Sequence, residues 1–219
     1  NNVVVCCAGS GLEQCQLKVD GAVYSVEFSP DSATLAAGLG GPSNSVLILD
    51  TQSGEIKSSL NVDSAVLSVA YSPDGTKLTA GLGYPSYSVV VFDTQTNEQI
   101  CSLIVDGQVW SVNWSPCGNK LSAACNNFDD DSYSVKIFSK EGSTGNFVCQ
   151  STLKVDDGVS SVVYSPDGSK LAAAHGKSVS IFNVETGEVQ CTVKGHSKDN
   201  EECTCKHDAG FFGNAYEAN

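Results

Sequence analysis

Residues 66–81, Val-Leu-Ser-Val-Ala-Tyr-Ser-Pro-Asp-Gly-Thr-Lys-Leu-Thr-Ala-Gly, form a pattern that the chain repeats at 23–38, 109–125 and 159–174. In each copy, apolar and small or polar residues alternate over six positions. A Ser-Pro-Asp-Gly turn or a close variant follows, and then a short run rich in Leu and Ala. Proline presets φ for the second position of such a turn and glycine accepts positive φ, so the pattern predicts a β-hairpin. The turns begin 43, 43 and 50 residues apart, at Ser29, Ser72, Ser115 and Ser165. A nearly fixed period of this size indicates a repeat architecture.

Each hairpin is followed by two more segments with strand character. The first is a β-branched run that ends in a large apolar residue, and its copies are 46–50, 89–93, 135–138 and 179–183. A turn then leads to the second segment, at 57–62, 100–105, 151–155 and 189–194. Four antiparallel strands in roughly 40 to 45 residues are the unit of a β-propeller blade. The sequence therefore predicts an all-β fold, a β-propeller of four-stranded antiparallel blades. Its four complete blades are expected at about 22–63, 65–106, 108–157 and 159–194.

The two ends of the chain do not fit a complete blade. Residues 3–11 align with the third strand of a blade and 12–19 with the fourth, so the chain opens within a split blade. We assign 1–196 to propeller blades and 197–219 to a tail that contains cysteines. If this tail supplies the two missing strands to residues 1–20, a ring of five blades closes through the termini. The alternatives are a tail with a different use, a piece of a longer propeller, and half-blades that pair between molecules, which would produce a polymer.

The blades resemble the WD40-type repeat family. The resemblance covers about residues 1–196 and rests on the Ser-Pro-Asp-Gly turn and on the large apolar residue, followed by Asp, that closes the third strand. It implies the propeller architecture and leaves the function open. The chain departs from the family pattern because the Trp of its Trp-Asp pair is replaced by Leu49, Phe92, Phe138 and Phe182. The Asp survives only at Asp50 and Asp93, and the Gly-His pair appears once, at Gly195-His196. The His-Asp tetrad typical of the family is therefore not expected in any blade.

Composition and charge exclude several classes of partner. The chain has 219 residues, 41% of them hydrophobic, and no run of 18 apolar residues that would predict membrane insertion. All 12 basic residues are Lys, and the net charge is −13. Nucleic-acid binding needs clustered cations that neutralise phosphates, with Arg as the usual residue at base edges, so the sequence excludes it. Anionic membranes and phosphorylated motifs are disfavoured for the same reason. The negative charge favours a basic partner.

One loop combines acidic and aromatic residues. The connection between the second and third strands of the third blade carries Phe128, Asp129, Asp130, Asp131 and Tyr133. The corresponding loop of the preceding blade carries Tyr84 and Tyr87, and tyrosine gives an interface a large rigid contact area. We therefore predict that these residues bind a protein partner.

Single aspartates should lie at the same end of the propeller, at Asp20, Asp63, Asp106, Asp156 and Asp157. A second interpretation of the carboxylates at this acidic end is that they bind Ca²⁺, which takes carboxylate oxygens as ligands. They also have a purely structural reading, in which each Asp caps a tight turn through its side chain.

Ten cysteines raise the question of the redox compartment. Cys6 and Cys15 face each other if their hairpin has a register that pairs Phe182 with Cys191 in the last blade, which would permit a disulfide. Cys7, Cys203 and Cys205 lie on the terminal segments proposed to meet, where a disulfide would lock the ring. Such cysteines favour an extracellular or secreted protein, with a cytoplasmic one as the alternative.

No stretch has the spacing of a catalytic, metal-binding or cofactor-binding motif. Gly176-Lys177-Ser178 lacks the upstream glycine of a phosphate-binding loop and precedes a strand rather than a helix. Cys203, Cys205 and His207 are soft ligands, but structural zinc needs four ligands with paired spacing. We therefore predict no enzyme, no catalytic residue, no metal and no cofactor.

Two functions remain compatible with the sequence. The first is a non-enzymatic protein–protein interaction scaffold of WD40-like type with an acidic loop face. The alternative is an extracellular structural subunit that self-assembles into a polymer or filament through split-blade pairing and disulfides.

Overall fold

The structure is a computed structural model that describes all residues except 7–8, 10, 12, 143–145 and 196–219. The described residues form strands, turns and loops, and they contain no helix that is long and apolar enough to cross a membrane. Two strands, β1 (Asn2–Cys6) and β2 (Glu13–Lys18), form a two-stranded antiparallel sheet. The others form four sheets of four strands each.

The four complete blades follow in chain order. The first contains β3 (Ala22–Phe28), β4 (Thr34–Gly40), β5 (Ser45–Asp50) and β6 (Ile56–Asn61). The second contains β7 (Val66–Tyr71), β8 (Lys77–Leu82), β9 (Ser88–Asp93) and β10 (Gln99–Ile104). The third contains β11 (Gln108–Trp114), β12 (Lys120–Asn127), β13 (Ser132–Glu141) and β14 (Asn146–Val155). The fourth contains β15 (Val159–Tyr164), β16 (Lys170–His175), β17 (Ser178–Asn183) and β18 (Val189–Lys194). The predicted all-β propeller with four complete blades and a split blade is confirmed.

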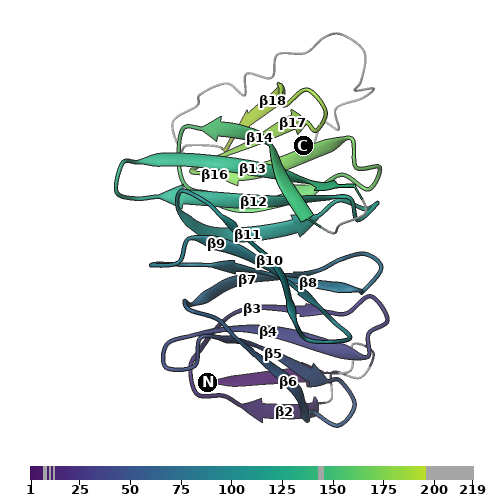
Figure 1. Ribbon diagram of the computed structural model, residues 1–219. Coiled ribbons are helices and arrows are strands. Elements are labelled where there is room, and N and C mark those ends of the chain that lie inside the picture. Colours follow the sequence, from purple (N-terminus) through teal and green to yellow (C-terminus); the bar gives the residue numbers. More distant parts are fainter. Residues whose placement is uncertain (7–8, 10, 12, 143–145, 196–219) are drawn as a thin grey trace, which may run out of the picture.

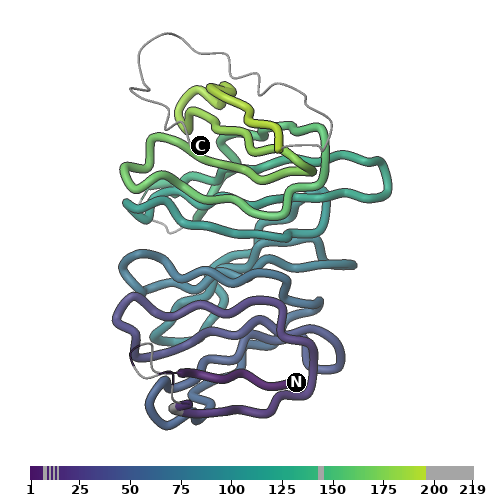
Figure 2. The backbone as a smooth tube through the Cα atoms, turned by 180° about the vertical axis from the view of Figure 1, so that it is seen from behind, coloured from purple at the N-terminus to yellow at the C-terminus, as the bar shows by residue number. Residues whose placement is uncertain are grey.

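The sheets stack face to face, and they succeed one another from β2 at one end of the molecule to β18 at the other (Figure 1). The view from behind shows the same order (Figure 2). The first strand of each complete blade after the first packs against the first and second strands of the blade before it. The tail that would complete the split blade lies outside the described residues, so closure of a five-bladed ring stays a prediction.

The predicted hairpin turns are held by their own polar side chains. In the turn between β7 and β8, Ser72 Oγ donates to Asp74 Oδ1 at 2.6 Å and accepts from Lys77 N–H at 2.9 Å. Asp74 Oδ1 also accepts from Thr76 N–H at 3.0 Å. Gly75 takes φ of 70°, as the turn requires. The same Ser-to-Asp bond forms between Ser29 and Asp31 and between Ser165 and Asp167.

Two β-bulges recur from blade to blade, and simple alternation does not predict them. One lies in the first strand, where Tyr24, Leu67, Trp110 and Ser160 are the extra residues. The other shifts the register between the third and fourth strands. It corrects the predicted cysteine pair, because Cys15 lies opposite Val5, and Cys6 lies opposite Glu13. In the last blade, Cys191 likewise lies opposite Ile181 rather than Phe182. Cys6 and Cys15 are both free thiols, so the predicted disulfide between them is wrong.

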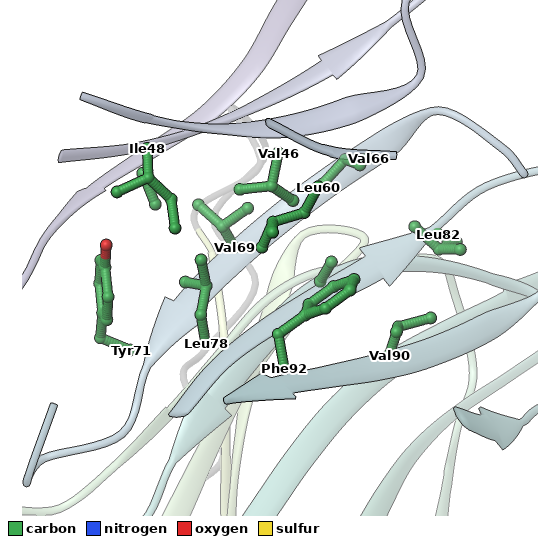
Figure 3. Packing of buried hydrophobic residues seen from close by; sticks show 12 residues of the cluster. Val46, Ile48, Leu60, Val66, Val69, Tyr71, Leu78, Leu82, Val90 and Phe92 are labelled. Carbon is green, nitrogen blue, oxygen red and sulfur yellow. The ribbon is translucent and has the colours of Figure 1, made fainter. Parts of the chain in front are cut away.

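The core is divided among the interfaces between successive sheets. Between the first and second blades, Val46 and Ile48 of β5 pack with Val69 and Tyr71 of β7 (Figure 3). Burying each such side chain contributes roughly 1.5 to 3 kcal/mol, so these interfaces hold the blades together.

A polar contact reinforces each of these interfaces. Ser25, Ser68 and Ser111 accept a hydrogen bond at 3.1 to 3.2 Å from the backbone N–H of a valine in the next blade's first strand. The recurring serine of the hairpin pattern therefore joins neighbouring blades.

Candidate functional site

The connections of the propeller gather at two ends. We call the "turn end" the one that carries the Ser-Pro turns and the connections from third to fourth strands. We call the "loop end" the one that carries the connections from second to third strands and those between blades. Ser64, between two blades, donates to Ser86 Oγ in the β8–β9 loop at 2.9 Å and accepts from Ser86 N–H at 3.1 Å. These bonds show that both kinds of connection meet at the loop end, as the sequence predicts for the acidic and aromatic residues.

Three aromatic rings form a contiguous cluster at the loop end of the third blade. Phe128 makes an edge contact with Trp110 at a centroid distance of 6.4 Å and another with Tyr133 at 6.2 Å. Trp110 is 45% exposed and Phe128 is 53% exposed. Large apolar rings are normally buried, so a cluster with this exposure presents apolar contact area to solvent.

One of the predicted carboxylates contacts this cluster. Tyr133 Oη donates to Asp131 Oδ1 at 3.3 Å, and Asp130 Oδ1 accepts from Ser132 N–H at 3.0 Å. Partial burial, and then the negative charge and hydrogen bond of Asp131, raise the pKa of Tyr133. The loop therefore holds the Asp131 carboxylate directly beside the Tyr133 ring.

The loop of the second blade joins the same surface. Tyr84 and Tyr87 make an edge contact with a centroid distance of 5.9 Å. Partial burial, and then the negative charge of Asp129, raise the pKa of Tyr87. The seven sequence-predicted site residues thus lie at the loop end of two neighbouring blades, in the β8–β9 and β12–β13 connections and at the start of β13. We call this region, with Trp110 added, the "aromatic–acidic patch": Tyr84, Tyr87, Trp110, Phe128, Asp129, Asp130, Asp131 and Tyr133.

Sequence reasoning missed Trp110. It lies on β11, where alternation assigns every second residue to the core, but it is the extra residue of the bulge between Val109 and Ser111. A bulge turns its extra residue out of the ladder and re-aims its side chain. The available signal was the repeat itself, because an aromatic residue, Tyr24, occupies the same bulge in the first blade.

The single aspartates at the loop end have local roles where the structure shows a contact. Asp106 forms an ion pair with Lys136 at 3.1 Å, and Asp157 Oδ1 accepts from Gly158 N–H at 2.7 Å. The bond of Asp157 agrees with the structural interpretation, in which Asp caps its own turn, whereas Asp106 pairs with a lysine on β13.

Metal binding gains no support from the arrangement of ligands. Across the described residues, no group of three or more His, Cys, Asp or Glu side chains is placed to hold a metal ion. The Ca²⁺ reading of Asp129 to Asp131 therefore has no structural observation behind it. Cys7, Cys203, Cys205 and His207 lie outside the described residues, so the disulfide and zinc readings of these positions are untested.

Comparison with known proteins identifies the repeat and the fold. The family model "WD domain, G-beta repeat" matches residues 13–50 and 147–183. Each match runs from the fourth strand of one blade to the third strand of the next. A comparison with curated protein sequences gives no match.

Three solved structures illustrate the likeness. Hydrazine synthase of Kuenenia stuttgartiensis superposes with a TM-score of 0.78 at 21% identity, over 88% of this chain and 60% of that one. The β-propeller domain of Myceliophteria thermophila Cps50 (Swd1) gives a TM-score of 0.69 at 20% identity, over 82% and 57%. A chain of the mitotic checkpoint complex gives 0.65 at 25% identity, over 76% and 50%. The chain thus spans half to three fifths of the length of these structures.

Proposed function

Because the chain is a β-propeller built of WD40 repeats, we propose that it is a non-enzymatic scaffold that binds another protein through the aromatic–acidic patch. Propellers of this kind commonly mediate protein–protein interaction. The observation that carries the proposal is the exposed cluster of Trp110, Phe128 and Tyr133 with carboxylates at its border. Aromatic anchors inside a polar rim are the usual anatomy of a protein interface.

The chemistry of the patch favours a partner segment rich in Lys or Arg. A cation placed over an aromatic face gains about 0.5 to 1 kcal/mol at an exposed site and about 2 kcal/mol when it is desolvated. Asp129, Asp130 and Asp131 add an attractive charge, and the chain's net charge of −13 steers cations toward it. A basic peptide can satisfy both features at once, because its long side chains combine an apolar stem with a charged tip.

A basic peptide library, titrated by calorimetry at low and physiological salt, tests the proposal. The variant Asp129→Asn/Asp130→Asn/Asp131→Asn should weaken binding roughly tenfold or more, with the larger loss at low salt. Asn keeps the shape and one acceptor oxygen of each side chain, so folding should be unaffected.

A matched control makes the same change of charge at the turn end. Glu55, Glu98 and Glu188 are exposed and lie in the turns between third and fourth strands. Their replacement by Gln removes the same three negative charges far from the patch. It should therefore leave the affinity for basic peptides unchanged, apart from the effect of the lower net charge. Equal loss in the two triple variants would assign the binding to overall charge and remove the patch from the proposal.

The absence of enzymatic activity is part of this proposal. Its support is the sequence, which shows no catalytic motif. The buried His175 lies 2.8 Å from Ser180, but Ser180 Oγ is also bonded to Thr192 Oγ1 at 2.9 Å. Both members of the pair are buried, so a substrate has no access to them.

The second candidate function is a structural subunit that self-associates through its split blade. The observation in its favour is that β1 pairs only with β2 within the described residues, which leaves one strand edge unpaired. Assembly through disulfides gains no support from Cys6 and Cys15, because both are free thiols. The extracellular location rests on cysteine content alone. Sedimentation over a dilution series separates the two functions, since a monomer at all concentrations excludes self-assembly.

A further inference from the structure

A cavity opens at the turn end, at the interface between the first and second complete blades. Its volume of about 430 Å³ lies in the range of small-ligand pockets. All of its lining residues belong to these two blades. We call it the "turn-end cleft", and the polar side chains of its lining that concern a ligand are those of Asp31, Thr34, Ser58, Tyr71, Asp74 and Asn97.

The floor of the cleft is the edge of the apolar core between the two blades. Ile48 of β5 and Tyr71 of β7 lie at the same end of this core (Figure 3). Tyr71 is 7% exposed, and its Oη lies 3.2 Å from Thr34 Oγ1 across the interface. A hydroxyl oxygen has two acceptor lone pairs, so the single bond between these groups leaves each oxygen able to accept another. The cleft therefore combines an apolar floor with hydroxyl acceptors.

The rim of the cleft is acidic. The Ser-Pro turns of the two blades lie side by side, since a Cβ at Gly75 would be 3.6 Å from Pro30 Cδ. This packing brings Asp31 of one turn and Asp74 of the next to the same cleft. Each carboxylate holds its own turn through Oδ1, whereas its Oδ2 accepts no hydrogen bond from the described residues. Both therefore keep one oxygen for a ligand.

The cation in the lining already has a partner. Lys57 Nζ lies 2.8 Å from Asp50 Oδ2, in an ion pair within the first blade. Across the interface, Ser58 Oγ donates to Asn97 Oδ1 at 3.3 Å, and this amide oxygen keeps a second lone pair. With Lys57 neutralised by its ion pair, the lining offers negative charge and acceptors. These features suit a cationic ligand.

At the second interface an aromatic ring lies in the corresponding corner. Phe147 of β14 makes an edge contact with Trp114, the counterpart of Tyr71, at a centroid distance of 5.4 Å. Ile100, the counterpart of Lys57, packs against the same apolar cluster. The polar cleft is therefore a departure of the first interface from its neighbour.

At the third interface a lysine crosses this corner. Lys120 Nζ lies 2.7 Å from Glu185 Oε1 of the next blade, and the Lys120 side chain is 18% exposed. Lys120 is the first residue of β12, and Lys77 and Lys170 likewise begin β8 and β16. In the first complete blade this position is Thr34, which begins β4. The shorter threonine leaves room where the other complete blades carry a lysine.

We propose that the turn-end cleft binds a primary ammonium group on an alkyl chain, which is the chemistry of a lysine side chain. The methylene groups pack on Ile48 and Tyr71, as lysine stems commonly cover apolar surface. The three N–H donors of the ammonium meet the free oxygens of Asp31 and Asp74 and the amide oxygen of Asn97. Bonds between an ammonium and carboxylates are stronger than those between neutral groups.

Two amines serve as probes, N-acetyl-lysine methylamide and n-butylammonium. In two-dimensional amide NMR spectra of the full chain, both should shift the N–H signals of Gly75 and Asn97 saturably. Acetylating the side-chain nitrogen of the first probe removes its charge and should weaken binding by roughly tenfold or more. Tighter binding of the capped lysine than of n-butylammonium would support a lysine within a polypeptide as the occupant, and equal binding would support a free alkylamine.

Variants of the protein locate the site. Thr34→Lys places the chain's own lysine at the cleft, as in the other complete blades, and should weaken both probes by roughly tenfold or more. The matched control Gln52→Lys adds the same charge at an exposed position of the turn end and should bind like the unchanged chain. Asn97→Gly removes one acceptor without strain, because Asn97 has φ of 61° and its counterpart in the first blade is Gly54. This variant should weaken binding severalfold.

Three results would overturn the proposal. They are the lack of a saturable shift, equal affinity for the acetylated probe, and undiminished binding by Thr34→Lys. An equal loss in Gln52→Lys would assign the binding to overall charge and overturn it as well. The aromatic–acidic patch lies at the other end of the propeller and shares no residue with the cleft. The variant Asp129→Asn/Asp130→Asn/Asp131→Asn should therefore bind both probes at the cleft like the unchanged chain, so either site can fail without the other.

Discussion

The two ends of the propeller are both rich in aspartate, and they use it in opposite ways. At the turn end Asp31, Asp74 and Asp167 accept hydrogen bonds from the serine that opens each turn. Asp50 accepts from the N–H groups of Gln52 and Ser53, and Asp93 makes the equivalent bonds. At the loop end Asp129, Asp130 and Asp131 border exposed rings. The carboxylates in the turns hold the backbone, and those of residues 129–131 are exposed on the loop of the proposed partner site.

We expect the greatest change to be the loss of stability in acid, because it acts on several turns at once. The serine hydroxyl and nearby backbone N–H groups lower the pKa of Asp74 and of Asp167 to about 2. The pKa values of Asp31, Asp50 and Asp93 are lowered as well. A group with a depressed folded-state pKa stabilises the fold above its unfolded pKa near 4 and loses that contribution as pH falls through the folded value. The urea concentration at the unfolding midpoint should therefore decrease as the pH is lowered from 4 to 2.

One partly buried carboxyl acts against this trend. Burial raises the pKa of Glu27, so protonation of Glu27 favours the folded state as pH falls toward its folded pKa. The variant Asp74→Asn/Asp167→Asn isolates the turns, because it should flatten the decline between pH 4 and pH 2. An equally steep decline in this variant would contradict the assignment of acid lability to the turn end.

Removing a single turn serine should have the next largest effect. Ser72 is almost fully buried, and Ser72→Ala leaves Lys77 N–H and the Asp74 carboxylate without the bonds that they share with its hydroxyl. An unsatisfied group of this kind costs about 2 kcal/mol, and urea denaturation measures the change in the free energy of unfolding. Ser132→Ala, an exposed serine at the loop end, is the control and should change this free energy by about 0.5 kcal/mol or less. Comparable losses at both ends would break the contrast between them.

The sequence predicted the repeated features well and the irregular ones poorly. The Ser-Pro-Asp-Gly turns and the Val-rich third strands each occur several times, so every copy corroborated the others, and the blade boundaries were correct. The bulges were missed because one extra residue in a strand leaves the apolar pattern almost unchanged. This omission displaced Cys15 by one position and hid Trp110.

The candidate site was found in outline because its residue types are unusual for a loop. Phe128, the three aspartates and Tyr133 occur together in the blade whose Ser-Pro turn is 50 rather than 43 residues from the next. Contacts between connections that are distant in sequence, such as Ser64 with Ser86, depend on how two loops pack, and no local pattern in the sequence carries that information.

The Ser-Pro turn of the third blade predicts a smaller change in the free energy of unfolding, because it lacks the aspartate of the other turns. Cys117 stands where the other turns have Asp, with its Sγ 3.3 Å from Ser115 Oγ. This bond and the N–H of Asn119 lower the pKa of the Cys117 thiol, so the turn already favours an anion at this position. Cys117→Asp should raise the free energy of unfolding by about 0.5 kcal/mol, because a carboxylate is the stronger acceptor. Cys149→Asp, on the exposed face of β14, is the control and should give no gain.

The smallest expected effect on stability, at the loop end, carries the largest functional consequence. Phe128 is half exposed and makes edge contacts with the rings of Trp110 and Tyr133, so Phe128→Ala should lower the free energy of unfolding by about 0.5 kcal/mol or less. The same change removes the central ring of the aromatic–acidic patch, and binding of a basic peptide should weaken severalfold because a central aromatic anchor dominates an interface. Urea denaturation and calorimetry measure the two quantities on one sample. A variant that loses stability as Ser72→Ala does, yet keeps its affinity, would mean that the rings hold the loops together instead of contacting a partner.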